Sequence, residues 1–324
     1  MKKRKSSILP IILLFIVGLA ILLYPSFSNW WNTRRSESLM VNYENIVNNI
    51  SEEDLGKYWE EANRYNKSIV GNVLPDAFAE EEANSPNAYY ETILNVAGDG
   101  FMGTVEIPVI NVKLPIYHYT TEEVLQKGVG HLPGSSLPIG GESTHSVLSA
   151  HRGLPSAKLF TDLDKVQEGN VFYLHVLNET LAYQVDLIKV IEPTDTSDLS
   201  IIEGKDYCTL FTCTPYAVNS HRLLVRGYRI PYTEEGYISE TNATAGMGDT
   251  NVLVIRILCV ILGILIAAII AWFLNRKNKK KPVVVPVVKE EEKEEEVIQP
   301  VVQDVPHKKR ALPYISEVNH DQKK

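Results

Sequence analysis

The sequence has few cysteines, since Cys208, Cys213 and Cys259 are the only three in 324 residues. Three cysteines cannot form a disulfide framework. Cys259 lies in an apolar run, and an odd number of positions separates Cys208 from Cys213, so on one strand their side chains face opposite ways. Any thiol chemistry therefore rests on Cys213.

The sequence also lacks a clustered basic face in its middle part, and its formal net charge is −8. Both features argue against nucleic acid as a partner. There is no internal repeat, phosphate-cradling glycine loop or metal-spaced His/Cys cluster, and Asp162 and Asp164 lack the rest of a calcium loop. We therefore expect neither a cofactor nor a metal. The hydrophobic content of 44% is enough for a real core in one or two domains.

Two apolar runs indicate membrane anchors. Residues 8–24 follow a basic start at 1–5, and we interpret them as a signal-anchor, with a cleaved signal peptide as the alternative. Residues 252–274 would form a helix about 34 Å long, enough to cross a bilayer core. The basic residues 275–281 follow. Basic flanks at both outer ends place both termini in the cytoplasm and the middle of the chain outside the membrane. A buried core helix is the alternative for either run.

The middle of the chain predicts a mainly β fold. Residues 36–68 favour helix, with a second helix starting after Ser51. From residue 100, short period-two segments separated by turns favour a β-barrel or a β-sandwich, with brief helical insertions near 121–126 and 156–166. The predicted strands are 102–107, 113–117, 145–150, 171–176, 181–191, 208–213 and 222–230.

The segment 207–222 (YCTLFTCTPYAVNSHR) contains the candidate nucleophile. It predicts a strand that ends at Cys213, a Pro-containing turn and a returning strand that begins at Arg222. A thiol at a strand end is rigidly held yet open to substrate, which suits a nucleophile. A nearby Arg favours the reactive thiolate and can stabilise an oxyanion. The alternative is a buried structural cysteine.

A cysteine nucleophile needs a proton acceptor and donor, and histidine is the usual choice. His151 lies where a predicted strand meets a loop. His221, close to Cys213 in the sequence and adjacent to Arg222, is the competing candidate. The spacing also excludes neither Arg226 nor Arg229 as the functional arginine.

The residues Thr-Leu-Phe-Thr-Cys at 209–213, followed nine positions later by Arg222, resemble the signature of the sortases, cysteine transpeptidases of Gram-positive surfaces. Residues 149–160 resemble the histidine-bearing segment of class C, or pilus-assembly, sortases. The resemblance covers about 89–231 and implies a closed β-barrel. It implies Cys213 as nucleophile, His151 as general acid and base, and Arg222 as the group that stabilises the oxyanion and substrate.

A loop upstream resembles the lid of class C sortases, in which an Asp pairs with the active-site Arg and an aromatic residue covers the Cys. Asp76 and Phe78 match those positions, whereas Ala77 stands where the family usually has Pro. Proline would fix φ, so this loop is less rigid than the family pattern. An ordinary solvated linker is the alternative.

The resemblance implies a membrane-anchored transpeptidase. Cys213 would cleave an LPxTG-type sorting signal between Thr and Gly through a thioacyl intermediate, and a pilin lysine would resolve it as an isopeptide bond. The implied partners are pilin subunits with such signals and an acceptor lysine, and the cell membrane. Three alternatives remain: a housekeeping-type sortase that uses a peptidoglycan precursor, a cysteine peptidase, and a non-catalytic binding module on a sortase-like barrel.

The expected fold is a mainly β, sortase-like closed barrel with short helices, an N-terminal helical segment and two transmembrane helices. The expected parts are a basic cytoplasmic end with a signal-anchor helix (1–24), a juxtamembrane helical segment (25–70), a lid-like loop (71–88), the catalytic barrel (89–235), a linker (236–251), a transmembrane helix (252–274) and a disordered, charged cytoplasmic tail (275–324).

Overall fold

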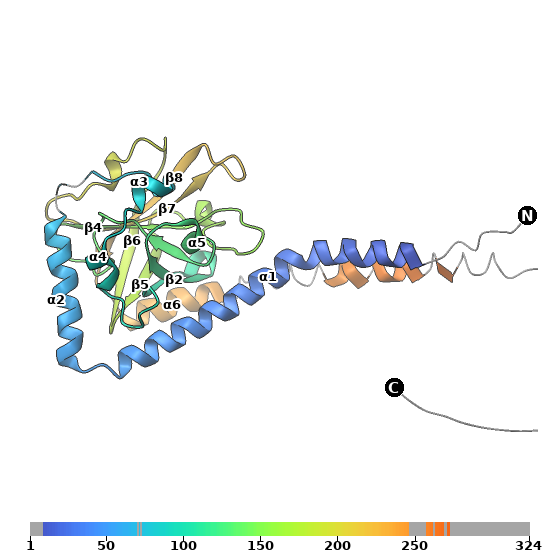
Figure 1. Ribbon diagram of the computed structural model, residues 1–324, viewed down its shortest axis with the longest axis horizontal. Helices are drawn as coiled ribbons and strands as arrows, with labels where there is room; N and C mark the ends of the chain where they lie inside the picture. The colour runs from blue at the N-terminus through green and yellow to red at the C-terminus, as the bar shows by residue number, and fades with distance from the viewer. Residues whose placement is uncertain are drawn as a thin grey trace, which may run out of the picture. The chain divides into compact units, whose positions relative to one another are not determined.

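The core of the protein is a closed barrel. The computed structural model describes residues 9–69, 71, 73–245, 257–261, 263–268 and 271–272. Within that part, the strands close in the order β1-β2-β3-β4-β7-β8-β6-β5. Figure 1 shows the strands together with the helices that flank them. They are β1 (Phe101–Ile107), β2 (Val112–His118), β3 (Val129–His131), β4 (Thr144–Ser149), β5 (Val171–Val176), β6 (Glu179–Ile191), β7 (Asp206–Thr214) and β8 (His221–Ile230). The predicted closed β-barrel is confirmed.

The sequence analysis missed one strand, β3, because its three residues are too few to show a period of two. Its place in the barrel comes from pairing, parallel to β2 and antiparallel to β4. The other strands match the seven predicted segments to within a few residues.

The helices among the described residues are four to 40 residues long. They are α1 (Leu9–Asn48), α2 (Glu52–Ser68), α3 (Glu80–Ala83), α4 (Ala88–Thr92), α5 (Glu122–Leu125) and α6 (Glu234–Ala245). Ser51 caps α2, because its side chain accepts from the Asp54 N–H. The insertion expected near 121–126 is α5, whereas residues 156–166 are mostly turns with one 3₁₀ turn at Leu163–Lys165. The expected linker 236–251 begins inside α6, whose Tyr237 packs edge-on against Tyr173 of β5.

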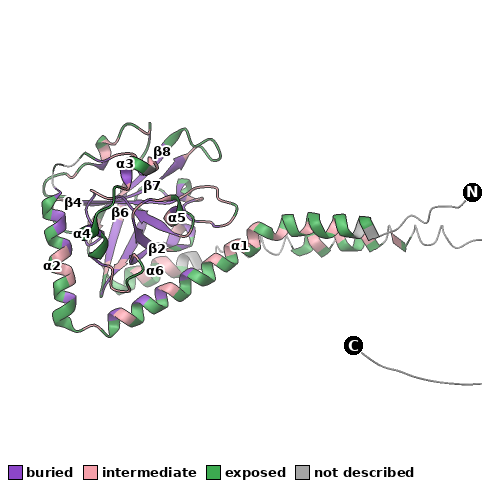
Figure 2. Ribbon diagram, in the orientation of Figure 1, coloured by how far each residue is buried: buried purple, intermediate pink, exposed green. Residues whose placement is uncertain are grey.

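Helix α1 is continuous through Pro25, so it joins the expected anchor and the start of the juxtamembrane segment in one element. Its residues from Leu13 onward are long and apolar enough to span a membrane. Large apolar side chains such as Leu14 and Ile21 are exposed, and the same part of α1 is coloured as exposed in Figure 2. Proline is tolerated in membrane helices because neighbouring groups can satisfy the freed backbone carbonyl.

The second predicted anchor, 252–274, lies partly outside the described residues. Its described parts, 257–261, 263–268 and 271–272, are helical. No second helix of spanning length occurs among the residues that the structure describes, so two transmembrane helices are not confirmed. The predicted tail 275–324 lies outside the described residues.

Apolar side chains pack on both faces of the sheet that contains β7 and β8. Successive strand residues point to opposite faces. Leu210 and Leu223 belong to the main core, whereas their neighbours Phe211 and Leu224 belong to a second cluster. The second cluster also includes Leu74, Ala77 and Ala83, which precede the barrel in the sequence, together with Leu132, Val147, Ile191 and Leu199. The segment 74–83 therefore covers the outer face of β7 and β8.

The C-terminal part of α1 is fixed to the barrel through Tyr43. The tyrosine hydroxyl donates to the Met102 carbonyl and accepts from the Leu177 N–H, both at 3.0 Å. Tyr43 is buried in the main core, and burial raises the pKa of its hydroxyl to about 12. One buried hydroxyl thus satisfies two backbone groups of the barrel.

We expect Tyr43→Phe to destabilise the protein by about 1–3 kcal/mol, because two buried backbone groups lose their partner. Chemical denaturation of the full chain measures this change. The exposed Tyr89 provides the control, since Tyr89→Phe should leave the midpoint unchanged. Equal midpoints for Tyr43→Phe and the parent would show that this contact does not hold α1 to the barrel.

Candidate functional site

Cys213 lies near the end of β7, directly opposite Arg222 of β8. Opposed residues of antiparallel strands point to the same face of the sheet. Cys213 is two positions from Phe211, so it shares the outer face with the second apolar cluster. Its side chain is only 8% exposed. The structure therefore brings the predicted nucleophile and the predicted arginine together on the covered face.

Arg222 is held by Asp76. The guanidinium Nε donates to Asp76 Oδ1 at 2.9 Å, and Nη2 donates to Oδ2 at 2.6 Å. Both side chains are largely buried, with 9% and 13% of their surfaces exposed. Charge-assisted, two-point pairs of this kind are the strong ones among ion pairs. Asp76 thus occupies two of the donor groups that an oxyanion would need.

Phe78 covers the same site. Its ring centroid lies 5.9 Å from the His151 ring and 6.0 Å from the Phe211 ring. The Arg222 guanidinium lies 5.1 Å from the Phe78 centroid, a cation–π contact. Asp76 and Phe78 therefore contact the predicted catalytic residues, although Ala77 stands between them where a proline was the family expectation.

Burial raises the pKa of the Cys213 thiol above its usual value. The Arg222 guanidinium opposes this shift, and the Asp76 carboxylate adds to it. The segment 74–83 thus disfavours the thiolate in two ways, by excluding water and by bringing a negative charge close to the sulfur. In this arrangement the thiol is protected rather than activated.

His151 follows β4, as the sequence predicted, and 20% of its side chain is exposed. Its Nε2 lies 3.0 Å from Oε2 of Glu122 in α5. The Gln126 amide lowers the pKa of the Glu122 carboxyl, and the His151 charge lowers it further. Sequence reasoning missed Glu122, because only the folding of α5 over the β4 end brings it to the histidine.

Arg152 was also missed. Its Nη1 donates to Thr214 Oγ1 at 3.0 Å, and its Nε donates to the Thr161 carbonyl at 3.2 Å. An ion pair with Asp164 completes its contacts. Because Thr214 follows Cys213 and Arg152 follows His151, this buried guanidinium links the two strand ends that present the candidate catalytic residues. The Arg directly after His151 was the available signal, and its partners are set by the fold.

The other histidines of the barrel have different surroundings. His221 pairs with Thr214, one register step from Cys213, so it points to the other face; it is exposed and contacts Ser220. Burial lowers the pKa of His131 to about 3 and that of His145 to about 4. Both are hydrogen-bonded within the barrel. His118 is likewise buried with a lowered pKa, and His175 contacts Glu106.

The competing arginines have other partners. Arg226 makes a two-point pair with Asp186, at 3.1 and 3.0 Å, and lies over the Tyr207 ring. Arg229 lies 3.9 Å from Asp206. Arg222 is thus the arginine that faces Cys213.

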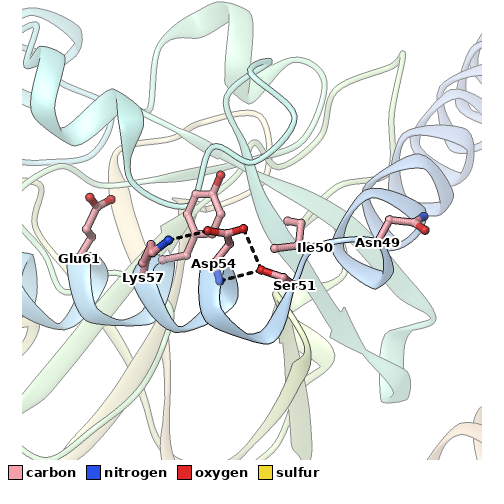
Figure 3. Close-up of a pocket in the computed structure, with 7 residues that line it drawn as sticks. Asn49, Ile50, Ser51, Asp54, Lys57 and Glu61 are labelled. Atoms are coloured by element: carbon pink, nitrogen blue, oxygen red, sulfur yellow. Dashed lines mark hydrogen bonds and ion pairs between the residues drawn. The ribbon is translucent and has the colours of Figure 1, made fainter.

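One hollow of about 660 Å³ lies at the corner between α1 and α2. Mostly polar residues and Ile50 line it, and Figure 3 shows the Asp54 carboxylate hydrogen-bonded to Lys57 and Ser51. None of its lining residues belongs to the segment 74–83 or to β7 and β8. Among the described residues there is no group of three or more His, Cys, Asp or Glu side chains that would hold a metal.

A family model described as the sortase domain matches residues 105–230. The chain is 30% identical over 131 residues to sortase D of Bacillus subtilis, a match that covers 40% of this chain and 63% of that protein. The chain spans less than two thirds of the length of the curated relatives it matches.

Solved sortase structures share a higher sequence identity with this chain than the curated relative above does. Sortase C1 of Streptococcus agalactiae is 51% identical with a TM-score of 0.55, over 60% of this chain and 94% of that chain. Streptococcus pneumoniae sortase C, described with reference to pilin substrate specificity, is 45% identical with a TM-score of 0.56, over 61% of this chain and 98% of that chain.

We expect Asp76→Asn to lower the pKa of Cys213, because it removes the negative charge that raises it. The pH midpoint of thiol alkylation should therefore move to lower pH. Asp186→Asn is the matched control, since it removes the same kind of partner from Arg226 on the same strand. A midpoint that stays in place or moves upward in Asp76→Asn would contradict this account.

Phe78→Ala should raise the alkylation rate of Cys213 at high pH, where the thiol is ionised and access limits the rate. Tyr89→Ala, a truncation of an exposed aromatic residue, should leave that rate unchanged. If both variants are labelled at the parent rate, Phe78 does not cover the sulfur.

Proposed function

We propose that this chain, which belongs to the sortase family, is a class C cysteine transpeptidase. The observation that carries this proposal is the placement of Cys213 opposite Arg222, with Phe78 in contact with both Arg222 and His151. A thiol and a cation on one face of the sheet, with the Phe78 ring in contact with both the cation and a candidate proton carrier, support acyl transfer as the reaction.

In the proposed first step, the Cys213 thiolate attacks the Thr carbonyl carbon of an LPxTG-type signal. A Cys213 sulfur–carbon bond forms, and Arg222 stabilises the oxyanion of the tetrahedral intermediate. The Thr–Gly bond then breaks, and His151 gives its proton to the departing glycine amine. A thioacyl enzyme and a free amine result.

In the second step, a lysine amine of a neighbouring pilin attacks the thioester. His151 takes up the proton of that amine, the isopeptide bond forms, and the Cys213 thiolate leaves. Support for a pilin as substrate comes from the class C relatives, one of which is described with pilin specificity. The acceptor separates this proposal from the housekeeping type, which would use a peptidoglycan-precursor amine.

The segment 71–88 would act as a lid. With Asp76 bound to Arg222, two guanidinium donors are occupied, and Phe78 covers the sulfur side. A substrate carbonyl must therefore displace Asp76 before Arg222 can stabilise an oxyanion. We expect the lid to open before the first step.

We further propose that both ends of the chain are anchored in the cell membrane, with both termini cytoplasmic and the catalytic domain, about 89–235, outside. Helix α1 supports the first anchor. Exposed apolar residues such as Ile257, Leu258 and Ile261 support the second, 252–274.

A decisive assay incubates the detergent-solubilised full chain with an LPxTG-type peptide and records its intact mass. We expect a peptide-sized adduct that is absent in Cys213→Ala, persists in Cys259→Ala and passes to a lysine-bearing pilin domain. Arg222→Lys should lower the rate of adduct formation by about 10²–10³-fold, as loss of an oxyanion donor does.

The alternatives give different results. An adduct that is released only to water would indicate a cysteine peptidase. An adduct that passes to a peptidoglycan-precursor amine rather than to a pilin lysine would indicate the housekeeping type. No adduct, even in the Asp76→Ala and Phe78→Ala variants, would favour the non-catalytic binding module.

A further inference from the structure

A second hollow, of about 380 Å³, lies between α1 and the barrel, away from Cys213. This volume is within the range of about 300–1,000 Å³ that is usual for ligand sites. One wall is the polar part of α1, including Asn29, Asn32 and Ser36, and the opposite wall includes Lys113, Lys127 and Lys158. The lysines come from β2, the turn after α5, and the loop that follows His151. We call this hollow the α1 groove.

The α1 groove lies next to the end of the apolar part of α1. Phe27, Trp30 and Trp31 form an exposed aromatic cluster there, with ring centroids 5.9–6.5 Å apart. Tryptophan is enriched where a membrane helix leaves the hydrocarbon core. From Trp30 to Glu37, the helix rises by about 10 Å. The headgroup layer is about 5–8 Å thick on each side, so the groove begins at headgroup depth.

The charges of the groove suit an anion. The charged residues that line the groove are three lysines and one acidic residue, Glu37. Each lysine also contacts a carboxylate that does not line the groove: Lys113 contacts Glu106 at 3.2 Å, Lys127 contacts Glu123 at 3.2 Å, and Lys158 contacts Asp162 at 3.3 Å. Lys113 and Lys127 remain about 40% exposed. The exposed pair of Lys127 and Glu123 contributes little, so this ammonium group can turn to a phosphate. Lys113 contacts the largely buried Glu106, and the Lys158 Nζ also donates to the Ile110 carbonyl at 2.9 Å, so these two charges are fixed beside the groove.

Two hydrogen bonds join α1 to the loop that forms part of the opposite wall of the groove. Asn32 Nδ2 donates to the Ser156 carbonyl at 2.9 Å, and the Lys158 N–H donates to Asn29 Oδ1 at 2.8 Å. These contacts tie the loop that carries Lys158 to α1 at the level of the aromatic cluster. The groove is therefore built by contacts between segments that are far apart in the sequence.

We propose that the α1 groove binds the phosphate headgroup of an anionic phospholipid, with Lys113, Lys127 and Lys158 as the binding cations. The argument rests on α1 crossing the membrane and is independent of the transpeptidase proposal. Free inorganic phosphate has the same binding chemistry, but the position beside the aromatic cluster favours the lipid.

The test uses the full chain in a mild detergent and native mass spectrometry. Phosphatidylglycerol and phosphatidylcholine with the same acyl chains are titrated separately, each with and without millimolar inorganic phosphate. We expect phosphatidylglycerol to be retained at least about tenfold more strongly than phosphatidylcholine, since each basic residue near a membrane surface raises the affinity for anionic lipid severalfold.

Three variants test the site. Lys113→Gln/Lys127→Gln/Lys158→Gln should lose the preference for phosphatidylglycerol, whereas Arg at the same three positions should keep it. The matched control, Lys67→Gln/Lys189→Gln/Lys205→Gln, removes the same charge from exposed lysines outside the groove and should also keep it. If the first variant does not fold, the single variant Lys127→Gln tests the site. We expect its preference for phosphatidylglycerol to fall about fivefold.

Equal retention of the two lipids by the parent protein would overturn the proposal. The proposal would also fail if the groove variant and the control variant lost the preference for phosphatidylglycerol to the same extent. Full displacement of the lipid by inorganic phosphate would show a soluble-anion site instead. Cys213→Ala should bind phosphatidylglycerol as the parent does, so failure of the transpeptidase proposal would leave this result unaffected.

Discussion

The cross-strand pair of Cys213 and Arg222 is the constraint on which the candidate site depends. The register of β7 against β8 places the thiol opposite the guanidinium, and the alternation of the strands turns both to the outer face of the sheet. Apolar residues of the segment 74–83 pack on that face in one cluster with Phe211 and Leu224. The barrel therefore positions the two groups, and in the proposed function the preceding segment controls access to them.

The ion pair between Asp76 and Arg222 links access to reactivity. While it is formed, Asp76 occupies the arginine and raises the pKa of the thiol, and Phe78 packs against Phe211 and Arg222 on the same face of the sheet. When the segment moves away, all three effects are removed together, since one short stretch supplies both residues. A substrate that enters would then meet a more acidic thiol and a guanidinium released from Asp76, with its Nη1 still bound to the Asn219 and His221 carbonyls. In the proposed function, the same contacts would maintain a protected resting state, and their release would give a competent open state.

The sequence was most informative where local patterns determine the structure. Period-two segments predicted every strand except β3, and the strand–turn–strand pattern around Cys213 placed Arg222 on the returning strand. It was least informative where contacts join distant segments. Glu122 and Arg152 contact the site only because α5 and the loop after β4 fold over it. The continuity of α1 through Pro25 was likewise missed, because proline usually ends a helix in water.

The central claim is that substrate and Asp76 compete for Arg222. The most direct measurement is a crystal structure of the protein with an LPxT-type acyl mimic bonded to the Cys213 sulfur. The account predicts that the acyl oxygen accepts a hydrogen bond from the Arg222 guanidinium and that Asp76 has left it. An acyl group bound while both Asp76–Arg222 hydrogen bonds remain would contradict it.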